Sequence, residues 1–132
     1  MEQSKALTAL QALANEDRLA LVRQLMPAGE QGLAAGEIGR ALGLAASRLS
    51  FHLAQLEQAG LVRSRKVARN VFYSVDAAGL GGTIAFLLND CCMEHPEVVA
   101  CCRRKNDLPP RVHVKGRADG DQAQGAPGIV KT

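Results

Sequence analysis

The apolar positions between residues 33 and 62 follow a helical spacing that changes phase once, at Gly43. Before this glycine, Ile38 and Ala41 lie on one face of a helix, and Gly43 supplies the left-handed residue with which helices often end. After it, an apolar stripe at i, i+4 and i+7 predicts a second helix from about Ala45 to Gly60. The stripe consists of Leu49, Leu53 and Leu56. Two helices that meet at one glycine predict a helix-turn-helix.

The opposite face of the second helix is polar and nearly free of acidic residues. A helix-turn-helix whose second helix has such a face reads the major groove of DNA. We therefore expect contacts with DNA bases from Ser47, Arg48, Ser50, Phe51 and Gln55. His52 lies beside the apolar stripe, so two interpretations stay open: a contact with DNA, or a partly buried, hydrogen-bonded histidine. Phe51 either touches thymine methyl groups or covers the groove between helices.

A β-hairpin is predicted directly after this helix. Residues 61–66 and 71–75 alternate in polarity and are rich in β-branched and aromatic side chains, and residues 67–70 form a short turn between them. The hairpin cations are expected to hold DNA phosphates, with an ordinary solvated face as the alternative. They are Arg63, Arg65, Lys66 and Arg69. A helix-turn-helix followed by a cationic hairpin predicts a mainly α winged helix with a β-hairpin wing.

Further amphipathic helices are predicted at both ends of this core. Leu7, Leu10 and Leu13 predict a first helix, and Asn15 and Asp17 offer caps for a second. The second helix carries Leu19, Val22, Leu25 and Met26.

A last helix is predicted from the cap Asp76 to about Asn89, with first turns loosened by three glycines. Its apolar stripe consists of Leu80, Ile84, Leu87 and Leu88. The first and last helices have more apolar surface than one small core can cover. They are therefore expected to pack across a two-fold axis in a homodimer.

Length and composition fit one small globular domain with a tail. The chain has 132 residues, 47% of them apolar, and a net charge of +3. We expect a domain over residues 1–106 and a disordered, Gly- and Ala-rich tail over residues 107–132. Neither a signal segment nor a stretch long enough to cross a membrane is present in the sequence. The expected location is the cytoplasm, with double-stranded DNA as partner and no membrane.

All four cysteines lie in one short stretch, as Cys91, Cys92, Cys101 and Cys102. Thiolates are soft ligands for thiophilic ions, and the nearby cations Arg103, Arg104 and Lys105 favour the thiolate form. The spacing C-C-x8-C-C is not that of a structural zinc knuckle. Arsenic(III) and antimony(III) need only three sulfur ligands, which this set can supply. Incidental thiols are the alternative.

No enzyme motif accompanies these features. The sequence lacks the C-x5-R of thiol enzymes that transfer phosphate or reduce arsenate, and it lacks a phosphate loop, a dinucleotide fingerprint and H-E-x-x-H. We therefore expect neither catalysis nor an organic cofactor.

The core motif resembles that of the ArsR-type (ArsR/SmtB) metalloregulatory repressors. The matching residues from Ala41 read A-L-G-L-x-x-S-x-L-S-x-H-L-x-x-L-x-x-A-G-L-V, followed by R-N-V-x-Y. The resemblance covers about residues 5–105. A vicinal cysteine pair after the last helix, with another cysteine further on, is similar to the arsenite-responsive branch. This implies a repressor of a palindromic operator that is released when As(III) or Sb(III) binds the cysteines.

Two departures from that family pattern bear on the site. The first helix of the helix-turn-helix has no C-x-C, so a sensor site would have to lie at the C-terminal end. Ala45 and Ala46 replace a polar N-cap, which costs about 1 kcal/mol of local helix stability unless Ser47 substitutes. Two alternative functions stay open. One is a repressor switched by a disulfide or by another soft metal, and the other is a constitutive structural DNA-binding protein. If the ligand is a metalloid, its third sulfur comes from Cys101 or Cys102.

Overall fold

The computed structural model describes residues 1–103. One compact unit comprises Met1–His95, and a second begins at Pro96 with helix α6 (Pro96–Arg103). The expected boundary at residue 106 and the expected tail lie outside the described residues. No helix within the described part of the chain is long and apolar enough to cross a membrane.

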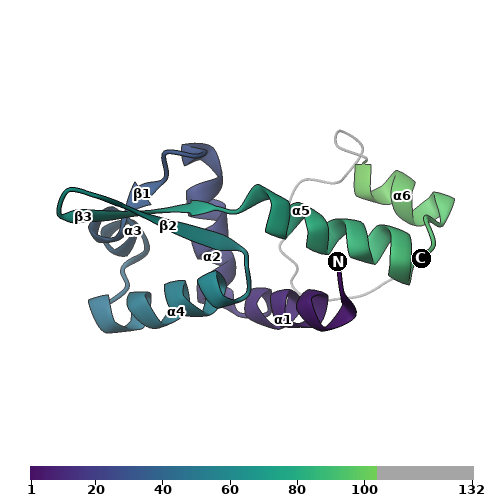
Figure 1. Cartoon of the computed structure of the whole chain (residues 1–132), viewed down its shortest axis with the longest axis horizontal. Coiled ribbons are helices and arrows are strands. Elements are labelled where there is room, and N and C mark those ends of the chain that lie inside the picture. The colour runs from purple at the N-terminus through teal and green to yellow at the C-terminus, as the bar shows by residue number, and fades with distance from the viewer. Residues whose placement is uncertain (104–132) are drawn as a thin grey trace. The chain divides into compact units, whose positions relative to one another are not determined.

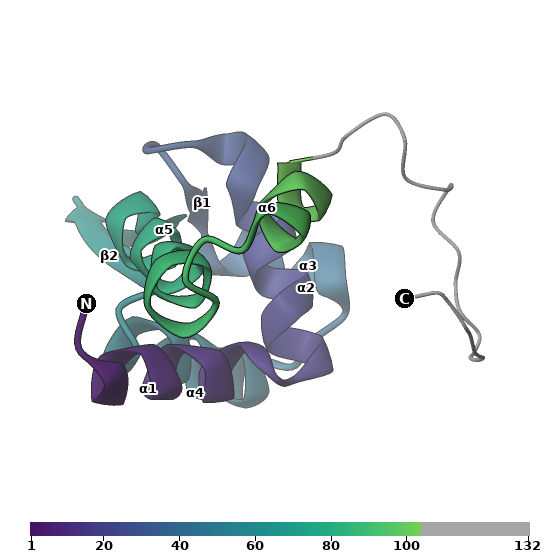
Figure 2. The ribbon, with the colours of Figure 1, turned by 90° about the vertical axis from the view of Figure 1, so that its right-hand side faces the viewer.

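The first unit is a winged helix-turn-helix, as predicted (Figure 1). A three-stranded antiparallel sheet in the order β1-β3-β2 carries the wing. Figure 2 shows α1 and α4 along one side of the unit, with α5 above α1. The elements are α1 (Gln3–Leu13), α2 (Glu16–Leu25), the short η1 (Met26–Ala28), β1 (Leu33–Ala34), α3 (Ala35–Leu42), α4 (Ala46–Gln58), β2 (Val62–Val67), β3 (Asn70–Val75), α5 (Ala77–Ala85) and η2 (Phe86–Cys91).

The helix-turn-helix has the boundaries that the apolar pattern predicts. Gly43 ends α3 in the left-handed conformation, with φ 68°. The apolar stripe of α4 is buried in the core, where each large aliphatic side chain contributes about 1.5–3 kcal/mol. It consists of Leu49, Leu53 and Leu56. Ala45 precedes α4 without a side-chain cap, and Ser47 does not replace one.

Helix α1 buries three alanines within the unit and leaves a leucine of its predicted apolar face exposed. Ala6, Ala9 and Ala12 are buried, whereas Leu7 is 50% exposed. The small alanine side chains let α1 pack closely on α4 and α5. The buried face of α1 is therefore the one whose small side chains allow neighbouring helices to approach closely. On α2, Asn15 is the cap as predicted, because its side chain accepts from the backbone N–H of Arg18.

The hairpin differs from the prediction by about one residue, and the sheet has one strand more. Val67 pairs with Asn70, so the turn contains only Ala68 and Arg69, and Ala68 has a φ of 58°. The short strand β1 pairs with β3, with Leu33 opposite Tyr73. The pattern did not reveal β1, because two residues are too few for an alternation.

The last helix of the first unit starts as predicted and ends differently. The side chain of Asp76 accepts from the backbone N–H of Gly79 at 3.1 Å. The expected looseness of the first turn is wrong at Gly79, because this residue packs directly against the backbone of Gly60. Beyond Ala85 the helix continues in π geometry over η2 as far as Cys91.

Candidate functional site

The exposed face of α4 carries the side chains that the sequence assigns to base contact. Ser47, Arg48, Ser50 and Phe51 are exposed, and Gln55 is half-buried. Phe51 is 57% exposed, with its ring edge-on to the ring of His52 at a centroid distance of 5.5 Å. More than half of the Phe51 side chain is therefore accessible, as a contact with thymine methyl groups requires. The base contacts themselves stay predictions.

His52 is buried, and this favours the second of its two interpretations. It is 6% exposed, and its Nδ1 lies 3.1 Å from Nη1 of Arg18. Its Nε2 lies 3.5 Å from Oδ2 of Asp17. The same carboxylate oxygen accepts a hydrogen bond from Nη2 of Arg48 at 2.9 Å. Asp17, which the sequence offered only as a cap, thus connects two residues of α4.

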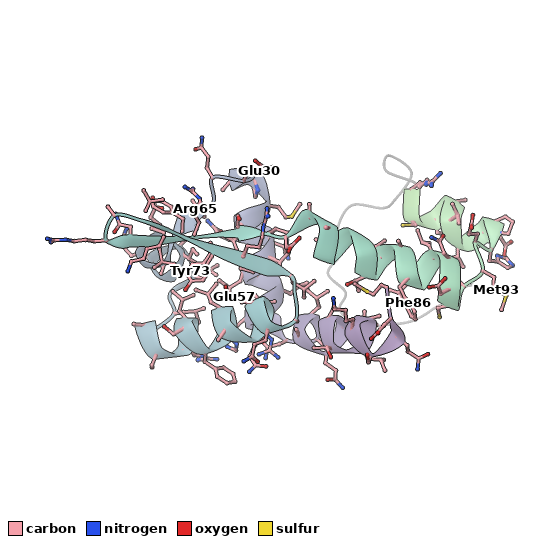
Figure 3. All side chains as sticks on the ribbon, viewed as in Figure 1. Glu30, Glu57, Arg65, Tyr73, Phe86 and Met93 are labelled. Atoms are coloured by element: carbon pink, nitrogen blue, oxygen red, sulfur yellow. The ribbon has the colours of Figure 1, made fainter. Side chains whose placement is uncertain are left out.

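The wing is held to the rest of the unit at two points. The hydroxyl of Ser64 donates to the Glu57 carboxylate of α4 at 2.8 Å. Glu57 is the only acid between residues 48 and 75, and it lies on α4 beneath the hairpin (Figure 3). The second point is Arg65, whose Nη2 donates to the backbone carbonyl of Gln31 at 2.8 Å and whose guanidinium lies 5.5 Å from the centre of the Phe72 ring. The first contact fixes the hairpin on α4, and the second fixes it on the segment that precedes β1.

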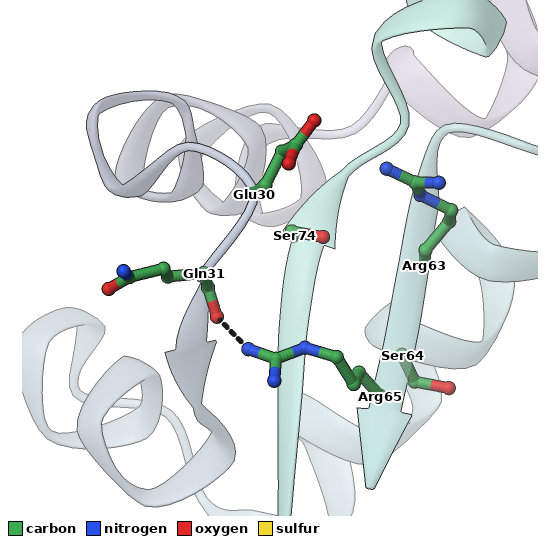
Figure 4. Close-up of a pocket in the computed structure, with 6 residues that line it drawn as sticks. All are labelled: Glu30, Gln31, Arg63, Ser64, Arg65 and Ser74. Carbon is green, nitrogen blue, oxygen red and sulfur yellow. Dashed lines mark hydrogen bonds between the residues drawn. The ribbon is translucent and has the colours of Figure 1, made fainter. Parts of the chain in front are cut away.

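The predicted phosphate-binding cations are all exposed, but they differ in their surroundings. They are Arg63, Arg65, Lys66 and Arg69. Arg63 and Arg65 border an open depression of about 570 Å³ beside the sheet (Figure 4). The depression is also lined by Glu30, Ser74 and Gln31, whose backbone carbonyl accepts from Arg65. Arg69 stands in the turn at the tip of the hairpin. Arg65 therefore has a structural role in addition to its predicted contact with phosphate.

Cys91 and Cys92 lie where the last helix of the first unit ends. Adjacent side chains diverge by about 100° on a regular α-helix, whereas the wider π geometry of η2 reduces that angle. Met93 and Glu94 then have φ values of 51° and 54°, so the chain turns sharply after the pair. Met93 is 82% exposed and extends beyond the helix end (Figure 3).

The thiol of Cys91 lies close enough to that of Cys92 to affect its pKa. Partial burial raises the pKa of the Cys92 thiol, and Cys91 raises it further through a side-chain hydrogen bond and through charge repulsion. Both effects act against the thiolate form of Cys92, whereas the cations expected to favour it lie in the second unit or outside the described residues.

Cys101 and Cys102 lie on α6 in the second unit, where both are exposed. None of the four cysteines forms a disulfide. Within residues 1–103, no three Cys, His, Asp or Glu side chains form a group that could hold a metal ion. A site that combines Cys91 and Cys92 with a thiol of α6 stays a prediction.

Comparison with known proteins identifies relatives of this chain. Residues 13–65 match a family described as a helix-turn-helix domain. The transcriptional activator HlyU of Vibrio cholerae is 39% identical over 84 residues, which are 64% of this chain and 75% of HlyU. The HTH-type transcriptional regulator YgaV of Escherichia coli is 37% identical over 91 residues, 69% of this chain and 88% of YgaV.

Solved structures share the fold. A structure of reduced HlyU from Vibrio cholerae superposes with a TM-score of 0.53 at 38% identity, over 67% of this chain and 90% of that one. The homodimeric winged helix-turn-helix domain of Mb0332 from Mycobacterium bovis, a possible ArsR-family regulator, has a TM-score of 0.53 at 23% identity and covers 78% of this chain and 89% of its own. This second likeness supports the fold alone. The chain belongs to the helix-turn-helix transcriptional regulators that include HlyU and YgaV, which bind DNA.

Proposed function

We propose that this protein is a homodimeric repressor that binds a palindromic operator and is released when trivalent arsenic or antimony binds its cysteines. In this proposal α4 reads the bases, the wing holds phosphates, and the effector binds Cys91, Cys92 and either Cys101 or Cys102.

The DNA-binding part rests on the exposed surface of α4 and the wing. Five cations and one acid occur between residues 48 and 75, and the acid is hydrogen-bonded to Ser64. Because phosphate neutralisation supplies most of the sequence-independent affinity, this surface suits a duplex. The short polar side chains of α4 then suit base edges in the major groove.

The proposal of a homodimer is based on apolar side chains that the first unit leaves exposed. Leu7 on α1 is 50% exposed and Ile84 on α5 is 44% exposed. The relative Mb0332 is described as homodimeric and has the same fold. A two-fold dimer through α1 and α5 would present two copies of α4 to two half-sites, whose spacing matches about one turn of DNA.

The observation that carries the metalloid response is the pair of free thiols, Cys91 and Cys92, where η2 ends. Arsenous acid, As(OH)3, exchanges three hydroxyl groups for three sulfurs: three S–H and three As–O bonds break, three As–S bonds form, and three waters leave. No net proton is released. A divalent cation must instead displace protons from thiols, so a raised pKa at Cys92 disfavours it more.

The coupling to DNA follows from linkage. Arsenite can release DNA only if it binds more tightly to a dimer geometry whose recognition helices do not match the groove spacing. DNA must then weaken arsenite binding by the same factor. Cys91 and Cys92 follow α5 and η2 directly, so a ligand bound there acts next to the proposed dimer helices.

The test is a titration of the reduced protein with arsenite, followed by fluorescence anisotropy of a labelled operator duplex. The expected result is release that saturates near one arsenic per protomer, with three sulfurs in the arsenic X-ray absorption spectrum. If neither arsenite nor antimonite changes DNA binding, the proposed metalloid response is contradicted. If oxidants also have no effect, the protein is better described as a constitutive DNA-binding protein.

A disulfide switch is the second candidate, because the relative HlyU has been solved in a form described as reduced. In that case two thiols lose two electrons and two protons to an oxidant such as a peroxide, and a disulfide forms. Release by peroxide without any metalloid, reversed by dithiothreitol, would identify this mechanism. The sign of regulation is tested separately by in vitro transcription from an operator-containing promoter, since the relative HlyU is named an activator.

A further inference from the structure

A network of polar side chains connects the start of α2 with the exposed face of α4. Arg48 and His52 lie one turn apart on α4, so their side chains share a face of the helix. Oδ2 of Asp17 accepts from Nη2 of Arg48 at 2.9 Å and lies 3.5 Å from Nε2 of His52. One carboxylate of α2 therefore meets both residues.

Arg18 fixes the orientation of the imidazole within this network. Its Nη1 lies 3.1 Å from Nδ1 of His52, and its Nε donates to the backbone carbonyl of Ala12 at 2.6 Å. Because a guanidinium can only donate, Nδ1 accepts and Nε2 carries the ring hydrogen that faces Asp17. The ring hydrogen on Nε2 of the buried His52 thus faces the Asp17 carboxylate on the side away from solvent.

Exposure increases along the network towards the surface. The side chain of His52 is 8% exposed, that of Asp17 28%, and that of Arg48 65%. The ion pair with the exposed Arg48 contributes little to folding stability, whereas the place of Asp17 in the first turn of α2 also suits the helix dipole. An acid beside a DNA-binding surface also repels phosphates. For Asp17, the ion pair with Arg48 is the interaction that offsets this repulsion.

We propose that Asp17 is a positioning residue for operator recognition: it holds the Arg48 guanidinium in the orientation that reads a base, and His52 and Arg18 hold Asp17. This inference rests on the proposed reading of DNA by α4. A long arginine side chain loses conformational freedom when it binds, and an orientation fixed beforehand reduces that loss. Asp17 therefore acts on sequence preference through Arg48, without touching DNA.

The test compares four variants of the full chain: Asp17→Ala, Asp17→Asn, Arg48→Ala and the double variant Asp17→Ala/Arg48→Ala. Wild-type protein first selects its operator from a pool of random duplexes, and each variant is then measured on that operator and on a random duplex. Glu16→Ala is the matched control, since Glu16 is an exposed acid one residue away. Circular dichroism melting shows whether each variant is folded.

Loss of a base-reading arginine lowers the ratio of operator to random affinity by about 5- to 150-fold. We expect Arg48→Ala to lower this ratio, Asp17→Ala to lower it by at least about threefold, and Asp17→Asn to lower it less because its amide oxygen still accepts. The double variant should equal Arg48→Ala, because Asp17 acts only through Arg48. Repeated selection should show relaxed preference at the same base position for Asp17→Ala and Arg48→Ala. Glu16→Ala should keep the ratio.

Two results would overturn the inference, and they differ in what else they affect. If Arg48→Ala lowers the ratio and both Asp17 variants keep it, or bind both duplexes more tightly by the same factor, Asp17 is only a repulsive charge and the proposed function stands. If Arg48→Ala also keeps the ratio, the inference fails together with base reading by Arg48. Should Asp17→Ala fail to fold, the folded Asp17→Asn variant decides between these results.

Discussion

The backbone of Gly79 lies so close to the carbonyl of Gly60 that a side chain on Gly79 would overlap that oxygen. This contact joins α5 to the turn that follows α4. We predict that Gly79→Ala lowers the free energy of unfolding by about 1–3 kcal/mol, because the two backbones must separate. Gly81→Ala is the control: no atom lies within 4 Å of its added Cβ, and alanine favours a helix by up to about 1 kcal/mol. Urea denaturation measures both, and equal effects would contradict the close contact.

The two wing arginines should differ when each is replaced by alanine. Arg69→Ala removes a charge at the hairpin tip, so it should weaken binding to operator and random DNA equally and reduce the salt slope by about 1. Arg65→Ala should do the same and also lower the melting temperature, since it removes the hydrogen bond to Gln31 and the stacking on Phe72. Anisotropy at several salt concentrations and thermal melting separate these effects. A loss confined to the operator would show that these residues read bases.

The cysteine variants should separate effector response from DNA binding. Cys91→Ser and Cys92→Ser should bind operator like wild type and no longer release it with arsenite, because the DNA-binding surface contains neither residue. Of the α6 thiols, Cys101→Ser should be more damaging than Cys102→Ser. The measurement is arsenite-dependent anisotropy of a labelled operator. Full release by both Cys91→Ser and Cys92→Ser would place the effector site elsewhere.

The raised pKa of Cys92 predicts slow alkylation at neutral pH. Only the thiolate reacts, so a higher pKa means less thiolate and a slower reaction at any given pH. Cys91→Ser removes the charge repulsion and the thiol partner, so it should lower the pKa of Cys92, although partial burial keeps that pKa above its ordinary value. Iodoacetamide labelling between pH 6 and 10, resolved by peptide mass spectrometry, gives the profile. An unchanged profile in Cys91→Ser would contradict the effect of Cys91 on the pKa of Cys92.

Local signals in the sequence were sufficient to predict most helices and strands of the first unit. Gly43, Asn15 and Asp76 end or begin helices through their own conformations and hydrogen bonds, so their neighbours in sequence are enough to identify them. The alternation of the hairpin located both long strands to within about one residue. The stripe of α4 is buried because three leucines on one face have no other stable arrangement.

Features that depend on distant residues were not predictable. The choice of alanines for the buried face of α1 depends on how closely α5 and α4 approach, which no local pattern encodes. Asp17 meets Arg48 across 31 positions of sequence, and Arg18 meets His52 across 34. No signal in the sequence singled out these contacts.

Under the proposed function, the attachment of the wing at Ser64 and Arg65 also affects how the protein finds its operator. A cationic hairpin held in one place presents its charge to any duplex, so the first encounter needs no particular sequence and its association rate rises as ionic strength falls. Once bound, the protein can slide along the phosphates while α4 samples successive base pairs. The wing thereby converts part of a three-dimensional search into a one-dimensional one.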